Sequence, residues 1–160
     1  MADIVTLIPD IHKLLVEGKE GVNEKHLKEF FNALREDINI FLSNDKRERT
    51  NNLRMSSIGK KDRKLWYDIN KGTQEELGGQ TLLKFFFGNL VESFLLLLVQ
   101  EAGHRVTDRQ KEVVVNGVKG HIDCKIDGVM VDVKSASDFA FKKFKNNTLH
   151  EDDPFGYVAQ

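Results

Sequence analysis

The sequence contains one cysteine, Cys124, almost no net charge and no long apolar run. A single cysteine excludes an internal disulfide framework and any zinc or iron–sulfur centre that needs several cysteines. A net charge of −1 excludes a uniformly basic coat for nucleic acid, although a local basic patch is compatible with it. Any metal site in this chain must therefore use ligands other than a cysteine cluster.

Secretory and membrane signals are also missing. The start, Met1-Ala-Asp-Ile-Val, has no basic segment before its short apolar stretch, so we do not predict a secretory signal. The longest apolar run, Phe94 to Val99, has six residues, whereas crossing a bilayer takes about 20. With 160 residues, 40% of them hydrophobic and 31% charged, the chain has enough apolar mass for a folded domain. We expect a soluble, cytoplasmic protein without a membrane partner.

Apolar spacing predicts two helices near the N-terminus. Residues 23–43 place apolar side chains every three or four positions, with Asn23 as a suitable N-cap and Asn44 as a suitable stop. A shorter helix is predicted to open near Pro9 and to end before Gly18. These helices carry no chemical motif, so we assign them to packing or to an oligomer surface.

A third helix is predicted over Thr81 to Ala102, with Gly103 well placed to end it. The segment is apolar almost all round, which is typical of a buried central helix. Its one internal acidic residue is Glu92. A buried carboxylate is unfavourable unless it is paired or binds a metal, whereas on a narrow solvent-facing strip it needs no partner. The helix pattern alone favours the second interpretation.

A basic segment lies between these helices. Residues 45–72 carry an excess of five positive charges, with Trp66 and Tyr67 among them. Such a cluster suits a phosphate-binding groove. A solvated linker followed by a surface helix explains the same charges equally well.

Two turn signals organise the C-terminal third of the chain. The pairs Asn116-Gly117 and Asp127-Gly128 are each flanked by alternating residues rich in valine and isoleucine. Pairs of this kind favour two-residue type I′ loops between antiparallel strands. They predict a three-stranded antiparallel meander over about 110–115, 118–126 and 129–134.

The two-residue loop at positions 127 and 128 also fixes the pairing register. Counting outward from it, Asp123 faces Asp132, and His121 faces Lys134. Because side chains alternate across a strand, these four share the face opposite the apolar one.

The opposition of Asp123 and Asp132 predicts a metal site. Directly opposed residues have Cβ atoms about 4.5–5.5 Å apart, where like charges are destabilising. Carboxylate oxygens at this separation suit Mg²⁺ or Mn²⁺, and Lys134 points to the same place. An exposed sheet face with scattered charges is the alternative, which the direct opposition makes less favoured.

Three short motifs follow one another along the chain. They are Gly88-Asn89-Leu90-Val91-Glu92 on the predicted helix, Gly120-His121-Ile122-Asp123 on one strand and Val131-Asp132-Val133-Lys134-Ser135 on the next. A helix glutamate, a strand aspartate and Asp-x-Lys in this order resemble the PD-(D/E)XK nuclease superfamily, and within it the RecB-like and phage lambda exonuclease-like branch.

Two further segments resemble that branch. Arg54-Met55-Ser56-Ser57, followed by Arg63 and Trp66-Tyr67, looks like its segment that contacts DNA phosphate. Tyr157-Val158-Ala159-Gln160 looks like the beginning of its Gln-x-x-x-Tyr helix. The resemblance covers about residues 53 to 160.

The resemblance implies an α/β (α+β) fold with a restriction-endonuclease-like core. In that core a central mixed sheet, with the antiparallel three-stranded meander, is flanked by helices. We expect an N-terminal helical extension at residues 1–45 and the nuclease-like domain at residues 46–160. The tyrosine of the last motif is not in the sequence, so we expect a domain shortened at its C-terminal end.

The resemblance also implies a metal-dependent DNA nuclease, and it favours an exonuclease over an endonuclease. Glu92, Asp123 and Asp132, with the carbonyl of Val133, would bind Mg²⁺, for which Mn²⁺ would substitute. Lys134 would orient the nucleophile or stabilise charge on the phosphate. We expect no iron–sulfur cluster, because Ile58-Gly59-Lys60 offers no ligand where some relatives have cysteines.

Other residues receive binding or supporting roles from the same resemblance. The DNA-phosphate contacts are Arg54, Ser56, Ser57, Lys60 and Arg63. The supporting residues are His121, Ser135 and Gln160. For His121, a role beside the metal ligands and a neutral structural role are equally favoured.

The alternative to a nuclease is a catalytically inactive nucleic-acid-binding or assembly module with a nuclease-like fold. Expected partners are DNA and either a second copy of the chain or a recombination protein. Recombination, repair or viral DNA processing would suit either function, in the host cytoplasm if the protein is viral.

Overall fold

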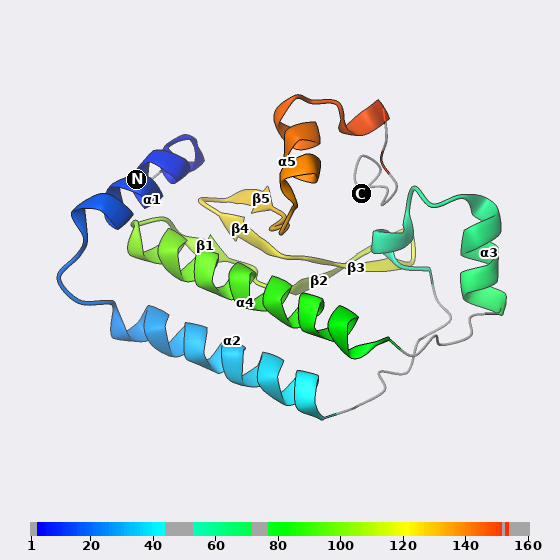
Figure 1. Ribbon diagram of the computed structural model, residues 1–160, viewed down its shortest axis with the longest axis horizontal. Helices are drawn as coiled ribbons and strands as arrows, with labels where there is room; N and C mark the ends of the chain where they lie inside the picture. Colours follow the sequence, from blue (N-terminus) through cyan, green and yellow to red (C-terminus); the bar gives the residue numbers. More distant parts are fainter. Residues whose placement is uncertain (1–2, 44–52, 72–76, 152, 154–160) are drawn as a thin grey trace. The chain divides into compact units, whose positions relative to one another are not determined.

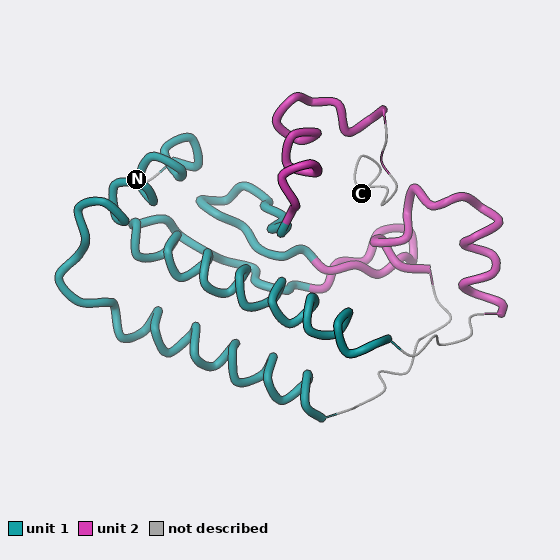
Figure 2. The backbone as a smooth tube through the Cα atoms, in the orientation of Figure 1, with its two compact units in different colours: residues 1–46, 77–111, 122–135 teal, residues 47–76, 112–121, 136–160 magenta. Residues whose placement is uncertain are grey.

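The computed structural model describes residues 3–43, 53–71, 77–151 and 153 (Figure 1). Within them, five α-helices and two small antiparallel sheets make a mixed α and β protein. The chain divides into two compact units (Figure 2). Unit 1 comprises Met1–Lys46, Leu77–Lys111 and Ile122–Ser135; unit 2 comprises Arg47–Glu76, Glu112–His121 and Ala136–Gln160. The N-terminal helices thus belong to the same unit as the predicted metal ligands.

The two N-terminal helices form as predicted. Helix α1 spans Leu7–Glu17, after the short 3₁₀ helix η1 (Ile4–Thr6), and stops where Gly18 takes a φ of +73°. Helix α2 spans Glu24–Leu42, and the side chain of its N-cap, Asn23, accepts a hydrogen bond from the backbone N–H of residue 25 at 3.0 Å. The predicted stop at Asn44 lies outside the described residues.

Helix α4 (Gly79–Glu101) is the longest described element of unit 1, and α2 runs alongside it (Figure 1). Aromatic rings join the two helices: Phe30 lies 6.3 Å from Phe94 and Phe41 lies 5.1 Å from Phe86, between ring centroids. Its end is also as predicted, with Gly103 at a φ of +94°.

The prediction that α4 is a buried helix holds only for one face of its C-terminal half, where Phe94 and Leu95 are still exposed. The buried positions are Ser93, Leu96, Leu97 and Val99. Several apolar side chains of the first half are exposed, among them Leu83, Phe85 and Phe87. The sheet of unit 1 is too short to cover them, because its strands have two or three residues each.

Helix α4 is also the one helix, among the described residues, that is long and apolar enough to cross a membrane. The mean hydropathy of its most apolar stretch is 1.9, and 22% of that stretch is buried. The core helix of a soluble protein can have the same length and hydropathy, so these two properties do not show that α4 spans a membrane. The expectation of a soluble protein stays a prediction.

The sheet of unit 1 has the strand order β1-β4-β5, with bounds Val106–Thr107, Cys124–Ile126 and Val129–Val131. Its β4–β5 hairpin has the predicted register, since Cys124 pairs with Val131. Cys124 and Ile126 pack with Leu96 and Val99 of α4 to form the core of this unit.

The turn of the β4–β5 hairpin is held from outside the sheet. Asp127 and Gly128 have φ values of +51° and +87°, as a type I′ loop requires. One carboxylate oxygen of Asp127 lies 2.6 Å from Nδ1 of the buried His104, and the other accepts the backbone N–H of Arg105 at 2.9 Å. These hydrogen bonds lower the pKa of Asp127. The turn, and with it the register, is therefore anchored to the segment after α4.

The predicted continuous meander is wrong. Strands β2 (Lys111–Val115) and β3 (Val118–Ile122) form a separate two-stranded sheet around the predicted turn at 116 and 117. The long strand 118–126 is interrupted at Asp123, whose carbonyl accepts the N–H of Gln110 at 2.9 Å and whose side chain accepts that of Val133 at 2.8 Å.

The third predicted strand, 129–134, ends early as a consequence. Its pairing stops at Val131, and the unpredicted β1 takes the other side of β4. The central mixed sheet is likewise not formed by the named strands, whose sheets are antiparallel. A parallel pairing occurs only as an isolated bridge between Arg54 and Lys119, among the described residues.

Unit 2 contains most of the β2–β3 sheet and several short helices. These are η2 (Met55–Ser57), α3 (Asp62–Asn70), α5 (Asp138–Lys145) and η3 (Leu149–Glu151).

Candidate functional site

Asp123 and Asp132 lie together at the open end of the β4–β5 hairpin, in unit 1. Each directly follows the last ladder pair, Cys124 with Val131, on its own strand. Oδ2 of Asp123 accepts the backbone N–H of Val133 at 2.8 Å, and the carboxyl group of Asp132 is near enough for its charge to act on Asp123. The opposition that the turn predicted is therefore present.

The electrostatics of Asp123 show that negative charge is disfavoured here. Partial burial raises its pKa most, and the charge of Asp132 raises it further. The N–H of Val133 and the charge of Lys134 act in the opposite direction but do not reverse the shift. A cation bound between these carboxylates would relieve the same repulsion.

Lys134 is directed at the same pair. Its Nζ lies 2.7 Å from Oδ1 of Asp132. The Lys134 side chain is 39% exposed and that of Asp132 is 63% exposed, so the ion pair contributes little to stability. The ammonium group therefore lies beside the carboxylate of Asp132, and because it is exposed, burial does not hold it in this position.

Glu92 reaches this neighbourhood from the middle of α4. Burial raises its pKa most, and the charge of Asp123 raises it next. The amide of Gln110 donates a hydrogen bond to Oε1 of Glu92 at 3.0 Å, and both this bond and the charge of Arg109 act to lower the pKa. Glu92 is partly buried and its side chain accepts a hydrogen bond, so it lies neither in the core nor fully in solvent, and its role stays a prediction.

Arg109 and Gln110 are the site residues that sequence reasoning missed. They lie between β1 and β2, and no motif or spacing marks them. Only the folded chain brings this loop back onto α4.

The donor set at this site fits a hard divalent cation in part. Within the described residues, no three His, Cys, Asp or Glu side chains are arranged around one point as ligands of an ion. The predicted set of Glu92, Asp123 and Asp132 is thus not assembled as a ready cage, although the two aspartates are together. Mg²⁺ usually binds through one or two carboxylates, with water and substrate phosphate completing its shell. Two opposed carboxylates meet that requirement.

The supporting residues are distributed differently. Ser135 lies in unit 1 against α4, because its Oγ would be 3.9 Å from a Cβ added at Gly88. His121 is exposed and lies in unit 2 on β3, which pairs with β2. The predicted strand pairing of His121 with Lys134 is therefore wrong. Gln160 lies outside the described residues.

The predicted phosphate contacts all lie in unit 2. Arg54, Ser56 and Ser57 form one short segment at η2, which is fixed against β3. The side chain of Met55 fills the space beside Gly120, where an added Cβ would lie 2.7 Å from its Sδ. Only glycine at position 120 leaves room for this close approach.

The remaining predicted contacts follow this segment along the chain. Lys60 is partly buried and lies 3.6 Å from the carboxylate of Asp68, whereas Arg63 is exposed in the first turn of α3. Trp66 and Tyr67 on the same helix pack edge to face, with ring centroids 5.3 Å apart, and both are about half exposed.

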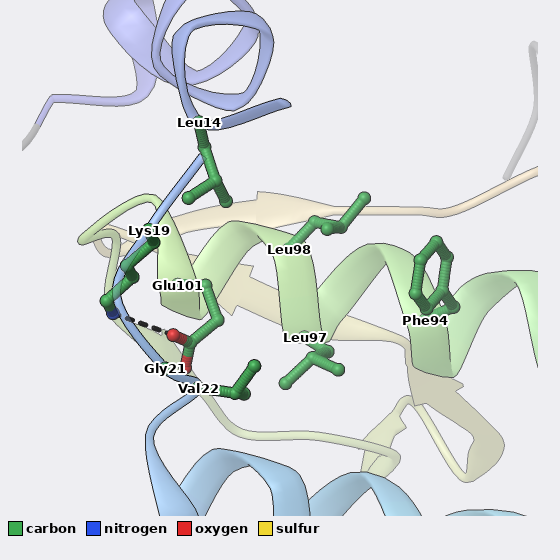
Figure 3. A pocket seen from close by; sticks show the side chains of 8 residues that line it. All are labelled: Leu14, Lys19, Gly21, Val22, Phe94, Leu97, Leu98 and Glu101. Atoms are coloured by element: carbon green, nitrogen blue, oxygen red, sulfur yellow. Dashed lines mark hydrogen bonds and ion pairs between the residues drawn. The ribbon is translucent and has the colours of Figure 1, made fainter. Parts of the chain in front are cut away.

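A cavity of about 240 Å³ lies elsewhere in unit 1 (Figure 3). Its lining residues are Leu14, Lys19, Gly21, Val22, Phe94, Leu97, Leu98 and Glu101. None of them is a predicted site residue. Figure 3 shows Lys19 reaching the carboxylate of Glu101 at its edge, with 2.7 Å between Nζ and Oε2.

Glu101 anchors the link between α1 and α2. Its side chain is 5% exposed, and it also contacts Nδ1 of His26 at 2.6 Å and the backbone N–H of Asn23 at 3.3 Å. Burial alone would raise the pKa of Glu101, but the hydrogen bonds from Lys19 and His26 outweigh it and lower the pKa.

Glu101→Gln is expected to lower the free energy of unfolding by about 2 kcal/mol at pH 7, because it leaves Lys19 and His26 without their charged partner. Because the pKa of Glu101 is lower in the folded state, its carboxylate stabilises the fold at pH values above the ordinary pKa of 4.5. This stabilisation is lost as the pH falls through the lowered pKa. Urea unfolding from pH 7 to pH 3 should show the two proteins converging in acid. Glu17→Gln, at a side chain that is 62% exposed, is the matched control. Equal stability of Glu101→Gln and wild type at pH 7 would contradict the prediction.

Comparison of the chain with protein-family models, curated proteins and solved structures found no match.

Proposed function

We propose that the chain is a Mg²⁺-dependent deoxyribonuclease of the PD-(D/E)XK type, with a restriction-endonuclease-like core. The observation that carries the proposal is the convergence of Asp123, Asp132 and Lys134 at one end of the β4–β5 hairpin. Two carboxylates that repel each other, with an ammonium group beside them, suit a reaction in which an anion is attacked. Glu92, brought near Asp123 from α4, adds a third acidic group in the order that the family pattern has.

Each group has a distinct role in phosphodiester hydrolysis. The carboxylates of Asp123 and Asp132 would hold the cation, and the carbonyl of Val133 and the carboxylate of Glu92 would complete the protein's ligands. A bound Mg²⁺ would lower the pKa of a water molecule and would neutralise negative charge on the phosphate. Lys134 orients the attacking water or stabilises the negative charge that develops on the phosphate. Arg54, Ser56 and Ser57 hold a DNA phosphate, which positions the strand without reading its sequence.

The second candidate is a nucleic-acid-binding or assembly module that does not catalyse DNA cleavage. One observation favours it: three acidic side chains do not converge as ligands among the described residues. In both cases DNA is the partner, in recombination, repair or viral DNA processing, and a second chain or a recombination protein would complete the assembly.

A cleavage assay with and without Mg²⁺ separates the two candidates. Linear duplex DNA labelled at one end and covalently closed plasmid are incubated with the protein in 5 mM EDTA or in excess Mg²⁺. We expect metal-dependent loss of the terminal label, faster than any plasmid nicking, because the proposal favours an exonuclease. DNA binding without cleavage of either substrate, in Mg²⁺ and in Mn²⁺, would establish the binding module instead.

Arg54→Ala is expected to weaken DNA binding about equally for all sequences, because a phosphate contact carries no sequence information. The slope of log K against log salt concentration should fall by about one unit. Fluorescence anisotropy with two unrelated duplexes over a salt series measures both quantities. Arg35→Ala, at an exposed position of α2, is the matched control and should bind as wild type does. A loss confined to one duplex would indicate base readout instead.

A further inference from the structure

Three aromatic rings are exposed on the short helix α5 (Asp138–Lys145), which belongs to unit 2 (Figure 1). Phe139 is 71% exposed, Phe141 is 59% exposed and Phe144 is 42% exposed. None of the residues of this helix, all of which the structure describes, is buried. Exposed apolar side chains that gather on one element, rather than singly, are typical of an interaction surface.

The ends of α5 stabilise the helix without burial of these rings. Oγ of Ser137, the N-cap, accepts the backbone N–H of Ala140 at 3.3 Å. Asp138 lies in the first turn, where a negative charge favours the helix dipole. The last turn carries the opposite charge, on Lys142, Lys143 and Lys145. The helix can therefore form while its aromatic side chains face a partner.

The lysines and the rings of α5 are interleaved. Lys142 and Lys143 lie three and four residues after Phe139, and Lys145 lies four residues after Phe141, so each ring has a lysine beside it on the helix surface. Nζ of Lys143 lies 5.0 Å from the centroid of the Phe139 ring. A helix that lies on a membrane instead separates its apolar and basic side chains onto opposite faces. Aromatic rings mixed with basic groups are typical of surfaces that bind single-stranded nucleic acid.

We propose that α5 binds single-stranded DNA, with unpaired bases stacked on Phe139 and Phe141 and phosphates held by the neighbouring lysines. The inference rests on the proposed function in one respect, the choice of DNA as the nucleic acid. Charge complementarity favours a polyanion, because α5 has three lysines and one acidic residue. Every base has a face that can stack on a ring, but in a duplex neighbouring base pairs cover these faces, so the rings favour a single strand.

Leucine substitutions test the stacking role. Phe139→Leu and Phe141→Leu keep an apolar side chain that favours a helix but remove the ring. Loss of one stacked base should weaken binding of single-stranded DNA by about fivefold or more in each variant. Phe139→Tyr retains a ring and should bind as wild type does. Phe85→Leu is the matched control, since Phe85 is 58% exposed on α4 and has no lysine three or four residues after it.

The charge of the lysines is tested separately from the rings. Lys142→Gln should lower the slope of log K against log salt concentration by about 0.7 unit, the value for one phosphate of a single strand. Fluorescence anisotropy of a labelled oligothymidine and of a duplex, both in EDTA, measures binding without cleavage. Duplex affinity should change little in the two leucine variants, and thermal melts check that each variant folds as wild type does.

The possible results separate this inference from the proposed function. Weaker binding of oligothymidine by both leucine variants, with wild-type affinity in Phe139→Tyr, supports the role of α5 even if no DNA is cleaved in Mg²⁺, in which case only the nuclease proposal fails. Wild-type affinity in both leucine variants, or no binding of oligothymidine by wild type, overturns the role of α5 even if duplex DNA is cleaved. Loss of binding to phosphatidylserine-containing vesicles by the leucine variants, with unchanged DNA affinity, would identify a membrane surface and reject the proposal.

Discussion

Lys134→Ala is expected to lower the rate of DNA cleavage by about 100-fold or more while Mn²⁺ binding stays near its wild-type level. The ammonium group lies 2.7 Å from Oδ1 of Asp132, where it would meet a bound phosphate, but an ammonium group is not a metal ligand. Its removal therefore takes away charge stabilisation in the transition state and leaves the oxygen donors in place. Single-turnover cleavage and Mn²⁺ titration measure the two effects separately.

Lys119→Ala is the matched control for this variant. Lys119 is also exposed and also pairs with a carboxylate, Glu112, at 3.1 Å, but it belongs to unit 2. It should cleave DNA at close to the wild-type rate. Cleavage by Lys134→Ala at the wild-type rate would reject the assigned role of the lysine, and a parallel loss in Lys119→Ala would point to general electrostatics.

The parts of the fold that the sequence predicted are set by neighbours along the chain. The Asp127-Gly128 loop fixes the register of its hairpin because both residues must take a positive φ, and Asn23 begins α2 because its side chain caps the first turn. The opposition of Asp123 and Asp132 follows by counting from that loop. These features need no knowledge of the rest of the chain.

The parts that were not predicted depend on contacts between distant segments. Strand β1 has two residues and no pattern of its own, yet it takes the place beside β4 that a continuous meander would leave free. The composition of α4 shows that it is apolar, but the amount of surface that covers it depends on α2 and on a short sheet. For the same reason Gln110 could not be identified from the sequence, because its partner Glu92 lies on another element.

Asp132→Asn is expected to abolish cleavage and the stabilisation of the fold by metal, without destabilising the metal-free protein. The substitution removes one of two repelling charges at nearly constant shape. Because the Asp132 side chain is 63% exposed, the repulsion amounts to about 1 kcal/mol at most, and the lost ion pair with Lys134 offsets part of it. In EDTA the variant should therefore be as stable as wild type or slightly more stable.

Added metal should act on wild type alone. At a hundredfold excess over its Kd, Mg²⁺ or Mn²⁺ should stabilise the wild-type fold by about 2.7 kcal/mol, because it binds the native state only. Asp132→Asn should show little of this stabilisation. Asp68→Asn, which changes another half-exposed aspartate with a lysine partner, should respond to metal as wild type does.

The pH dependence supplies an independent check on the facing carboxylates. The pKa of Asp123 is raised in the folded state above its ordinary value of 3.8, so the folded protein takes up a proton at a higher pH than the unfolded chain. The metal-free wild type should therefore gain stability as the pH falls through that raised pKa towards 3.8. In Asp132→Asn the charge of the neighbour is gone, and burial is the main remaining cause that raises the pKa of Asp123. The gain should therefore be smaller, and any advantage of the variant at pH 7 should shrink in acid. Two results together would show that the two aspartates do not form a cation site: a clearly lower stability of Asp132→Asn than of wild type in EDTA, and no change in wild-type stability when metal is added.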